Sequence, residues 1–281
     1  MIVFLNLYCD MLYYKNPKKY GRHAMYKELK QKVRNCEQLC GTHMALNYCA
    51  ITEILAGVGF DFVWVDSEHS PLTWEDIRLH LVSCKAGGSP AFVRVPMHDF
   101  NFTKKVLELG PAGIIFPQIE TVEEADFAMK STLYPPLGRR GYGPQMAVGY
   151  GKRELKDYLE NINDELCRFV QVESETAVKN LPEIVKNPWI DGFIIGPMDL
   201  SGSIGCLGDC FCDRNIALIK EAVKILRDNN KTVGISTGSD DPEVLQFWHD
   251  LGINMISTGV DYAYMRNAAV RNLANIRKIQ A

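Results

Sequence analysis

Short apolar runs alternate with longer amphipathic segments from about residue 25 onward. The runs are rich in β-branched and aromatic residues, which is typical of buried β-strands. The longer segments repeat apolar residues at helical spacing, so that Ile51, Ile54, Leu55 and Val58 share one face. Strands are predicted at residues 36–41, 60–65, 91–95, 113–116, 168–172, 192–195, 232–235 and 255–257. Helices are predicted at residues 47–58, 73–85, 102–109, 121–131, 153–161, 175–185, 216–227 and 242–251, with one more at each end of this region.

Eight strands that alternate with helices predict an α/β fold, and a single (β/α)8 TIM barrel over residues 25–281 is the leading architecture. A chain of 281 residues has a normal length for one such barrel. A doubly wound open sheet is the alternative. Against it, no predicted strand is followed by GxGxxG or by a phosphate-binding loop.

The first 24 residues differ from this pattern. Residues 1–14 are apolar and aromatic, but they lack a basic segment, contain Asp10 and are too short to span a bilayer. Residues 15–23 are basic and polar and are typical of a linker. We expect residues 1–24 to be a weakly attached N-terminal extension, and Met25 to be the natural start, which the intact mass of the native product would test.

Composition narrows the class of protein. The net charge is -3, 47% of residues are hydrophobic and 23% are charged, which is typical of a globular domain. No basic run predicts binding to nucleic acid or to an anionic membrane. The nine cysteines are scattered and odd in number, which favours reduced thiols in a cytoplasmic protein.

Three of the cysteines, Cys206, Cys210 and Cys212, lie close together in the sequence. The cluster supplies only three sulfurs and has no histidine beside it. A structural zinc site needs four such ligands, so a loop with incidental thiols is favoured over a metal site.

Polar residues gather where the predicted strands end. In a parallel barrel these carboxyl ends meet at one mouth, where barrel enzymes carry their chemistry. Asp66, Glu68 and His69 follow the second strand within four residues, although each alone could be a cap, a solvated acid or a structural histidine. The full set is Thr42, His43, Asp66, Glu68, His69, Arg94, Pro117, Gln118, Gln171, Glu173, Gly196, Pro197, Asp199, Ser236 and Thr258.

Two of these carboxylates favour a metal site. Glu173 and Asp199 follow neighbouring strands and have no thiol or imidazole beside them, so they suit Mg²⁺ or Mn²⁺ better than a structural zinc. Both could equally be solvated or capping acids. Arg94 near the same mouth needs an anionic or carbonyl partner, either a developing enolate or Glu68 or Glu173. His69, near Asp66 or Glu68, has the carboxylate-oriented imidazole of a general base.

One long segment has no regular pattern. Residues 134–151 are too rich in Gly and Pro for a helix or a strand. Loops of this length in compact domains are often functional.

Several of these segments together resemble one family. From about Met25 onward the chain resembles the HpcH/HpaI family of metal-dependent, class II pyruvate aldolases, in the phosphoenolpyruvate-binding barrel group. The matching segments are Ala56–Asp61, Val65–His69, Val93–Val95, Tyr134–Gly141, Gln171–Glu173, Ile195–Ser201 and Gly259–Asp261, in the family's order over nearly the whole barrel.

The resemblance implies a lyase that cleaves a 4-hydroxy-2-oxo acid reversibly to pyruvate and an aldehyde. It implies Glu173 and Asp199 as ligands of a divalent metal, Mg²⁺ or Mn²⁺ first and Co²⁺ or Zn²⁺ as alternatives. His69 with Asp66 would be the acid/base dyad, and Arg94 would hold the keto oxygen. Gln171 would lie beside the substrate, and the backbone at Gly196, Pro197 and Met198 would hold its carboxylate. A homo-oligomer, a hexamer, is also implied.

The chain departs from the family's pattern in the half that would bind the aldehyde. His43 stands where many relatives have tryptophan, Glu108 where the family often has aspartate, and residues 143–146 differ as well. Two alternatives therefore stay open. One is the same enolate chemistry with another electrophile, in a synthase or an acyl-CoA lyase, and the other is a non-catalytic barrel that binds an oxo acid.

Overall fold

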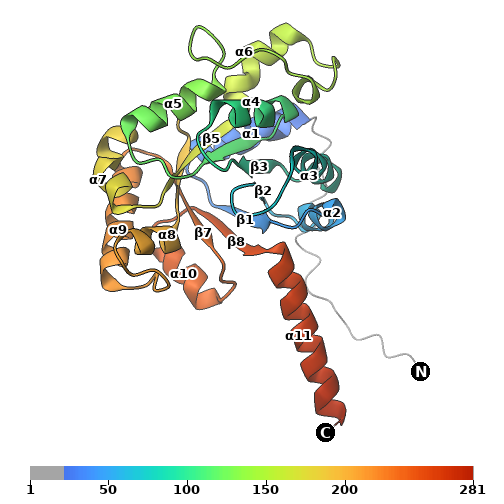
Figure 1. Cartoon of the computed structure of the whole chain (residues 1–281), viewed down its shortest axis with the longest axis vertical. Coiled ribbons are helices and arrows are strands. Elements are labelled where there is room, and N and C mark those ends of the chain that lie inside the picture. Colours follow the sequence, from blue (N-terminus) through green and yellow to red (C-terminus); the bar gives the residue numbers. More distant parts are fainter. Residues whose placement is uncertain (1–21, 281) are drawn as a thin grey trace, which may run out of the picture.

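The computed structural model describes residues 22–280, so residues 1–21 of the proposed extension lie outside the described part. Eight parallel strands close into a barrel in sequence order, and helices surround it (Figure 1). The predicted (β/α)8 barrel is confirmed, and the open-sheet alternative is wrong. The strands are β1 (Leu39–Met44), β2 (Phe62–Asp66), β3 (Ala91–Arg94), β4 (Gly113–Phe116), β5 (Cys167–Val172), β6 (Gly192–Ile195), β7 (Thr232–Thr237) and β8 (Met255–Val260).

In the described part, a helix follows each strand, and α1, α6 and α8 are additional. Their bounds are α1 (Arg22–Arg34), α2 (Cys49–Ala56), α3 (Trp74–Gly87), α4 (Phe100–Leu109), α5 (Val122–Thr132), α6 (Leu155–Glu165), α7 (Glu175–Ile184), α8 (Pro197–Ser203), α9 (Asp213–Asp228), α10 (Pro242–Asp250) and α11 (Asp261–Gln280). A short 3-10 helix, η1 (Met146–Val148), lies in the long loop. No helix over residues 197–203 is predicted from the sequence, because two turns are too short to show an apolar period, although Pro197 occupies the favoured first position.

Strand β1 begins three residues later than predicted. The N–H groups of Cys36 and Glu37 donate to the carbonyls of Val33 and Lys32, both at 3.0 Å. Cys36 also has a φ of 53°. Residues 36–37 therefore end α1 and do not pair in the barrel, although their composition resembles that of a strand.

Aromatic side chains fill the interior of the barrel. The rings of Phe62 and Phe92 stack with centroids 4.6 Å apart, and Phe169 lies 5.1 Å from Phe92. A Cβ atom at Gly113 would lie 2.6 Å from the ring of Phe92, so glycine makes room for that ring. Large residues on some strands thus face glycine on others.

The same inward-facing positions continue toward the carboxyl ends of the strands. Successive side chains of a strand point to opposite faces, so residues two apart share a face. Arg94 therefore follows Phe92 on the inner face, and Gln171 follows Phe169. The aromatic layer supports a polar layer directly above it.

Helix α1 covers the amino end of the barrel. Leu29 and Val33 are buried with the inner aromatic cluster. Lys30 Nζ donates to the carbonyl of Leu166 at 2.5 Å, just before β5. Thr232 Oγ1, at the start of β7, donates to the carbonyl of Val33 at 2.5 Å. The amino end is therefore sealed, and the carboxyl end is left as the mouth.

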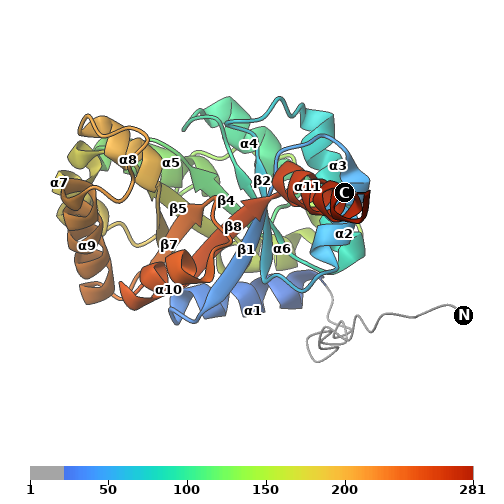
Figure 2. The ribbon, with the colours of Figure 1, turned by 90° about the horizontal axis from the view of Figure 1, so that it is seen from below.

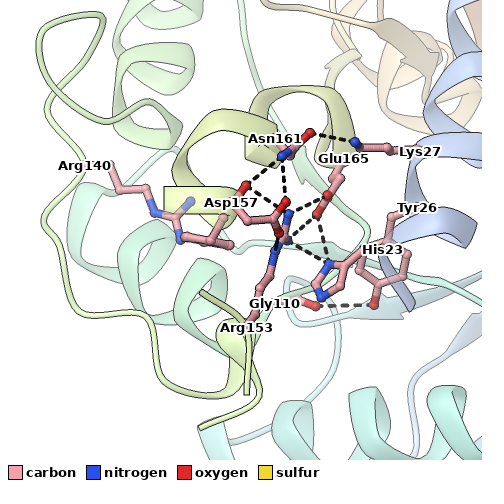
Figure 3. Close-up of polar contacts among 10 residues, drawn as sticks. His23, Tyr26, Lys27, Gly110, Arg140, Arg153, Asp157, Asn161 and Glu165 are labelled. Carbon is pink, nitrogen blue, oxygen red and sulfur yellow. Dashed lines mark hydrogen bonds and ion pairs between the residues drawn. The ribbon is translucent and has the colours of Figure 1, made fainter. Parts of the chain in front are cut away.

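A polar network attaches the start of α1 to α6, as Figure 3 shows. Glu165 lies 3.1 Å from His23 Nδ1 and accepts from Arg153 at 2.7 and 2.8 Å. Lys27 Nζ donates to Asn161 at 2.6 Å. The last three residues of the proposed extension, 22–24, thus belong to α1.

Helix α11 extends away from the other elements in Figure 1 and is seen end-on in Figure 2. Its first residue, Asp261, is buried and accepts from the N–H groups of Ala45 and Leu46 at 3.2 and 2.8 Å. Farther along, four apolar side chains at intervals of three residues are exposed, namely Val270, Leu273, Ile276 and Ile279. None of the helices in the described part combines the length and the apolar character needed to cross a membrane.

Candidate active site

Arg94 is the centre of the polar layer at the mouth. Its Nε and Nη2 donate to the two carboxylate oxygens of Asp66 at 3.0 and 2.6 Å. Its Nη1 lies 2.9 Å from Glu68 Oε2 and 3.4 Å from Gln171 Oε1. Burial alone would raise the pKa of Asp66, but hydrogen bonds and charge from Arg94 outweigh it and lower that pKa. Asp66 and Arg94 therefore form a buried ion pair.

Glu173 is held at the end of β5 by three neighbours. Its Oε1 accepts from Gln171 Nε2 at 2.6 Å, and its Oε2 accepts from the backbone N–H of Gln118 at 2.9 Å. A Cβ atom on Gly196 would lie 2.9 Å from both Cγ and Oε1 of Glu173. The carboxylate thus rests against the backbone of Gly196, and only glycine leaves that space.

Negative charge accumulates around Glu173. Its pKa is raised to about 7, first by burial and then by the charges of Glu68 and Asp199. The pKa of Glu68 is also raised to about 7, by burial and by the charges of Asp66 and Asp199 against the opposing charge of Arg94. Asp199, in the first turn of α8, is exposed to solvent.

These carboxylates share one cavity of about 420 Å³. The lining comes from the ends of strands and from the turns and helices that follow them. It comprises Glu68, His69, His98, Gln118, Ile119, Glu120, Glu124, Glu173, Ser174, Ala177 and Asp199. The predicted residues of the second, fifth and sixth strands thus meet in one place.

The donor set fits an open site for a hard divalent cation. Within residues 22–280, no three His, Cys, Asp or Glu side chains are arranged to hold a metal ion by themselves. Glu173 and Asp199 could supply two oxygen donors and leave other positions to water and substrate, as Mg²⁺ sites commonly do. A cation there would relieve the repulsion that raises the pKa of Glu173.

His69 does not form the side-chain dyad with Asp66 that the resemblance implies. Asp66 Oδ1 instead accepts from the backbone N–H groups of Glu68 and His69, at 3.0 and 3.3 Å. Because Arg94 occupies both carboxylate oxygens, the imidazole of His69 turns to Glu68, with Nε2 3.8 Å from Oε2. The side chain of His69 is 61% exposed, so its position leaves it open to water and to a ligand in the cavity.

His43 lies at the inner side of the mouth, where the sequence predicts the end of the first strand. Its ring stacks on Trp64 with centroids 4.7 Å apart, and its Nε2 is 3.5 Å from Ser236 Oγ. Burial, with a smaller contribution from the charge of Arg94, lowers the pKa of His43 to about 4. The imidazole is therefore neutral at pH 7.

The predicted carboxylate-binding backbone forms the start of α8. The N–H of Gly196 donates to the carbonyl of Val172 at 3.2 Å, and Pro197 has no N–H to donate. The free donors of that segment are the N–H groups of Met198 and Asp199, which have no intrahelical partner at a helix start. The role of Gly196, Pro197 and Met198 in binding substrate stays a prediction.

Four polar residues that line the cavity are absent from the sequence prediction. They are His98, Glu120, Glu124 and Ser174. Glu124 belongs to a capping box with Thr121 at the start of α5, so its spacing signals a helix start and gives no sign of a cavity. From the sequence, His98 is interpreted as an ordinary surface or packing histidine, because it follows no predicted strand end.

The long loop, residues 134–151, lies away from this cavity, since none of its residues is in the lining. Arg140 fixes the loop by donating to Leu107 O at 3.2 Å and to Tyr158 Oη at 2.8 Å, and its guanidinium lies 4.5 Å from the ring centroid of Tyr134. Gln145, Met146 and Tyr150 line a separate cavity of about 470 Å³ with residues of α3 and α4. Arg140 of the Tyr134–Gly141 segment thus packs against α4 and α6.

The cysteine cluster forms part of the loop between α8 and α9. The neighbouring thiol of Cys212 raises the pKa of Cys206. Phe211 anchors the loop on α10 by stacking on Trp248, with centroids 5.3 Å apart. The interpretation of this cluster as a loop with incidental thiols stays a prediction.

Two known proteins are similar in sequence to most of this chain. The hydroxypyruvate/pyruvate aldolase of Roseobacter denitrificans is 33% identical over 238 residues, which is 85% of this chain and 92% of that relative. The 4-hydroxy-2-oxo-heptane-1,7-dioate aldolase of Escherichia coli is 32% identical over 229 residues, 82% of this chain and 87% of that relative.

Solved structures agree with the sequence comparison. The crystal structure of an HpcH/HpaI aldolase/citrate lyase family protein from Burkholderia cenocepacia superposes with a TM-score of 0.84 at 29% identity, covering 89% of this chain and 99% of that one. A family model described as HpcH/HpaI aldolase/citrate lyase matches residues 40–268. The chain belongs to the HpcH/HpaI aldolase/citrate lyase family.

Proposed function

We propose that the chain is a pyruvate aldolase, a carbon–carbon lyase that cleaves a 4-hydroxy-2-oxo acid reversibly into pyruvate and an aldehyde. The relatives named as pyruvate and hydroxy-oxo-acid aldolases support this reaction. The observation that carries it is the single cavity at the barrel mouth in which Glu68, His69, Glu173 and Asp199 meet beside buried Arg94.

The proposed site assigns a divalent metal ion, Mg²⁺ or Mn²⁺, to Glu173 and Asp199. Such an ion supplies Lewis acidity that favours negative charge on the oxo oxygen of the substrate. The backbone of Gly196 and the amide of Gln171 fix the carboxylate of Glu173 before substrate binds. Arg94 adds a positive charge at the floor of the mouth, where charge develops during cleavage.

The proposed cleavage needs one proton acceptor. The imidazole of His69, directly or through a water, takes the proton of the C4 hydroxyl of the substrate. The electron pair of the C3–C4 bond then forms the enolate of pyruvate, and the aldehyde leaves. Protonation of C3 yields pyruvate and completes the balance. Glu68 Oε2 lies 3.8 Å from His69 Nε2 and orients the imidazole.

Pyruvate release, coupled to lactate dehydrogenase, tests the proposal. Cleavage of a 4-hydroxy-2-oxo acid should stop in EDTA and return with Mg²⁺ or Mn²⁺, with Co²⁺ and Zn²⁺ as further probes. Glu173→Gln should abolish activity, and it should abolish the quenching of the protein's fluorescence by the added metal ion. The circular dichroism spectrum should stay unchanged. Full activity in EDTA would refute the metal assignment. If the enzyme cleaves an acyl-CoA thioester and none of a panel of hydroxy-oxo acids, it is an acyl-CoA lyase and the aldolase proposal is wrong.

We also propose that the chain forms a homo-oligomer, a hexamer according to the resemblance, and that α11 contributes to it. The exposed apolar residues of α11 support this, because in the described part of the chain the only buried residue of that helix is Asp261. Light scattering on purified protein tests it, and a monomeric mass would refute it. The predicted location in the cytoplasm stays a proposal, which fractionation of cells would test.

A further inference from the structure

Three half-buried thiols lie together in the loop between α8 and α9. Cys206, Cys210 and Cys212 are free, and the proposed aldol chemistry uses none of them. Two other thiols, those of Cys84 and Cys167, are buried, and burial raises the pKa of each to about 12. Buried thiols of this kind are inert, whereas half-buried thiols are open to a small reagent. The loop therefore gathers three thiols that such a reagent can reach.

The backbone folds Cys206 and Cys212 toward each other. The N–H of Asp209 donates to the carbonyl of Cys206 at 2.9 Å, and the N–H of Cys212 donates to the carbonyl of Asp209 at 3.3 Å. Each of these bonds closes a turn, in which the first and fourth residues lie close together. The two turns in succession leave the thiols of Cys206 and Cys212 as neighbours. A disulfide bond between them therefore requires only a local rearrangement of the loop.

Cys212 is the anchored member of this pair. Its carbonyl accepts from the N–H of Ile216 at 3.0 Å, so that Cys212 begins α9. The preceding residue, Phe211, stacks on Trp248 of α10 with centroids 5.3 Å apart. A covalent bond draws two sulfurs closer than the distance at which thiols are in contact. Because Cys212 is fixed to two helices, Cys206 moves more than Cys212 when that bond forms.

Movement of Cys206 reaches α8 through backbone hydrogen bonds. The N–H of Cys206 donates to the carbonyl of Ser201 in α8 at 2.8 Å. Buried Asn215 adds a second link, because its Nδ2 donates to the carbonyl of Cys210 at 2.7 Å and to that of Pro197 at 3.0 Å. The loop is therefore bonded both to the first residue of this short helix and to a residue near its end.

We propose that Cys206 and Cys212 are a modification site for low-molecular-weight disulfides. Such an oxidant joins the two thiols in an intramolecular disulfide, and this bond weakens the binding of the proposed divalent cation. Asp199 lies in the first turn of α8, so movement of that helix changes its distance from Glu173. Mg²⁺ demands near-ideal geometry from its oxygen ligands, so such a change lowers its affinity. The effect on the cation rests on the proposed function, whereas the disulfide bond does not.

The oxidation consists of two thiol–disulfide exchanges. The thiolate of one cysteine attacks a sulfur of the small disulfide, so that a mixed disulfide forms and one small thiol leaves. The thiolate of the other cysteine then attacks the protein sulfur of the mixed disulfide and releases the second small thiol. The protein thus loses two electrons and two protons, which the two released thiols carry away. A thiol reductant reverses both steps.

Treatment of the full chain with oxidised glutathione tests the modification site. The reaction is run at about pH 8.5, where thiolates are populated, and peptides are mapped without reduction. We expect a peptide pair that joins Cys206 to Cys212 and that disappears with dithiothreitol. Cys210→Ser, in the same loop, is the matched control and should keep this crosslink, whereas Cys212→Ser should lose it. A crosslink of either cysteine to Cys210, or no crosslink in the loop, would overturn the proposal.

Binding of Mn²⁺, followed by the electron paramagnetic resonance signal of the free ion, tests the consequence. In the wild type and in Cys210→Ser, affinity should fall about tenfold after treatment with oxidised glutathione. Cys212→Ser should bind Mn²⁺ equally well before and after treatment, which separates the crosslink from glutathione adducts on other cysteines. Equal affinity of the reduced and the crosslinked wild type would refute the effect on the cation.

Glu173→Gln separates this inference from the proposed function. If the reduced wild type and Glu173→Gln bind Mn²⁺ equally, the proposed metal assignment is wrong, and the effect of the crosslink on the cation falls with it. The peptide map still decides the modification site in that case, because the pairing of Cys206 with Cys212 depends on the loop alone.

Discussion

At the scale of single residues, the site depends on Arg94. One guanidinium holds both oxygens of Asp66 and lies 2.9 Å from Glu68. A planar fork of donors can satisfy these partners together, whereas an ammonium group cannot. The residue type at this position therefore fixes the geometry of the whole polar layer.

Replacing Arg94 by lysine tests this dependence. Arg94→Lys keeps the charge but loses the two-point contact with Asp66, so kcat/KM for aldol cleavage should fall about a hundredfold or more. The free energy of unfolding should also fall, by about 3 kcal/mol. Steady-state kinetics and urea titrations measure both effects. Arg78→Lys, which changes an exposed pair with Glu75, is the control and should alter neither. Wild-type kinetics in Arg94→Lys would contradict the proposed role.

Gly196 gives a second prediction at this scale. The Cβ of Gly196→Ala would lie 2.9 Å from Glu173, so the carboxylate must move. Activity should fall about a hundredfold, because displacements of about 1 Å in a catalytic site have effects of that size. The melting temperature should change little. Gly238→Ala, where a Cβ meets no atom within 4 Å, is the matched control. Equal activity of the two variants would show that Glu173 is not constrained in this way.

At the scale of elements, hydrophobic periodicity predicts most strands and helices of the barrel but not the residues at which they begin and end. The apolar runs locate the core of each strand, and α8 is too short to produce a period. Arg94 and Gln171 could be placed because each stands two residues after an inward phenylalanine. Asp66 pairs with Arg94 and not with His69. This pairing depends on how side chains of neighbouring strands meet, and the residue pattern within one strand does not contain that information. His98 and Glu124 come from a turn and a helix start, where no strand period applies.

The packing of α1 gives a prediction about stability. Leu29 is 4% exposed and packs into the inner cluster. Leu29→Ala should lower the free energy of unfolding by about 3 kcal/mol, through lost burial and the cavity that remains. Chemical denaturation measures this change. Leu207→Ala, at a side chain that is 75% exposed, should change it by less than about 0.5 kcal/mol. Similar effects of the two variants would show that α1 does not contribute to the core.

The network between α1 and α6 predicts a dependence on pH. Burial alone would raise the pKa of Glu165, but hydrogen bonds from His23 and Arg153 outweigh it and lower that pKa. The pKa of Glu165 is thus lower in the folded than in the unfolded chain. Its stabilising effect is present above the unfolded value, about 4.3, and is lost as the pH falls through the folded value.

Glu165→Gln should therefore weaken the loss of stability in acid. Urea midpoints measured from about pH 6 down to about pH 3 should fall less steeply in Glu165→Gln than in the wild type. Glu221→Gln, at an exposed position of α9, should follow the wild type. Parallel curves for all three proteins would rule out a contribution from this network.

At the scale of the whole molecule, the two ends of the barrel have different tasks. Helix α1 seals the amino end, and the polar layer with its cavity occupies the carboxyl end. Helix α11 follows directly after β8, so it leaves the barrel from the same rim as the cavity. An assembly formed through α11 would bring a second copy close to this rim.

A charged pair on α11 tests that arrangement. Leu273→Asp combined with Ile276→Asp places two carboxylates on the exposed apolar side of the helix. The mass measured by light scattering should fall below that of the wild type, because burial of these charges in an interface is costly. Asn275→Asp and Arg277→Asp, two exposed positions of the same helix, test charge without loss of apolar surface. An unchanged mass in the Leu273/Ile276 variant would exclude α11 from the interface.

The seal formed by α1 also has a consequence for biosynthesis. Val33 accepts its hydrogen bond from Thr232, which lies 199 residues later in the chain, and Lys30 pairs with Asp191, 161 residues later. On the ribosome, α1 is made before these partners and must wait for most of the barrel before it can bury its apolar face. Closure of the barrel is therefore a late event that joins segments of the nascent polypeptide made early and late in synthesis.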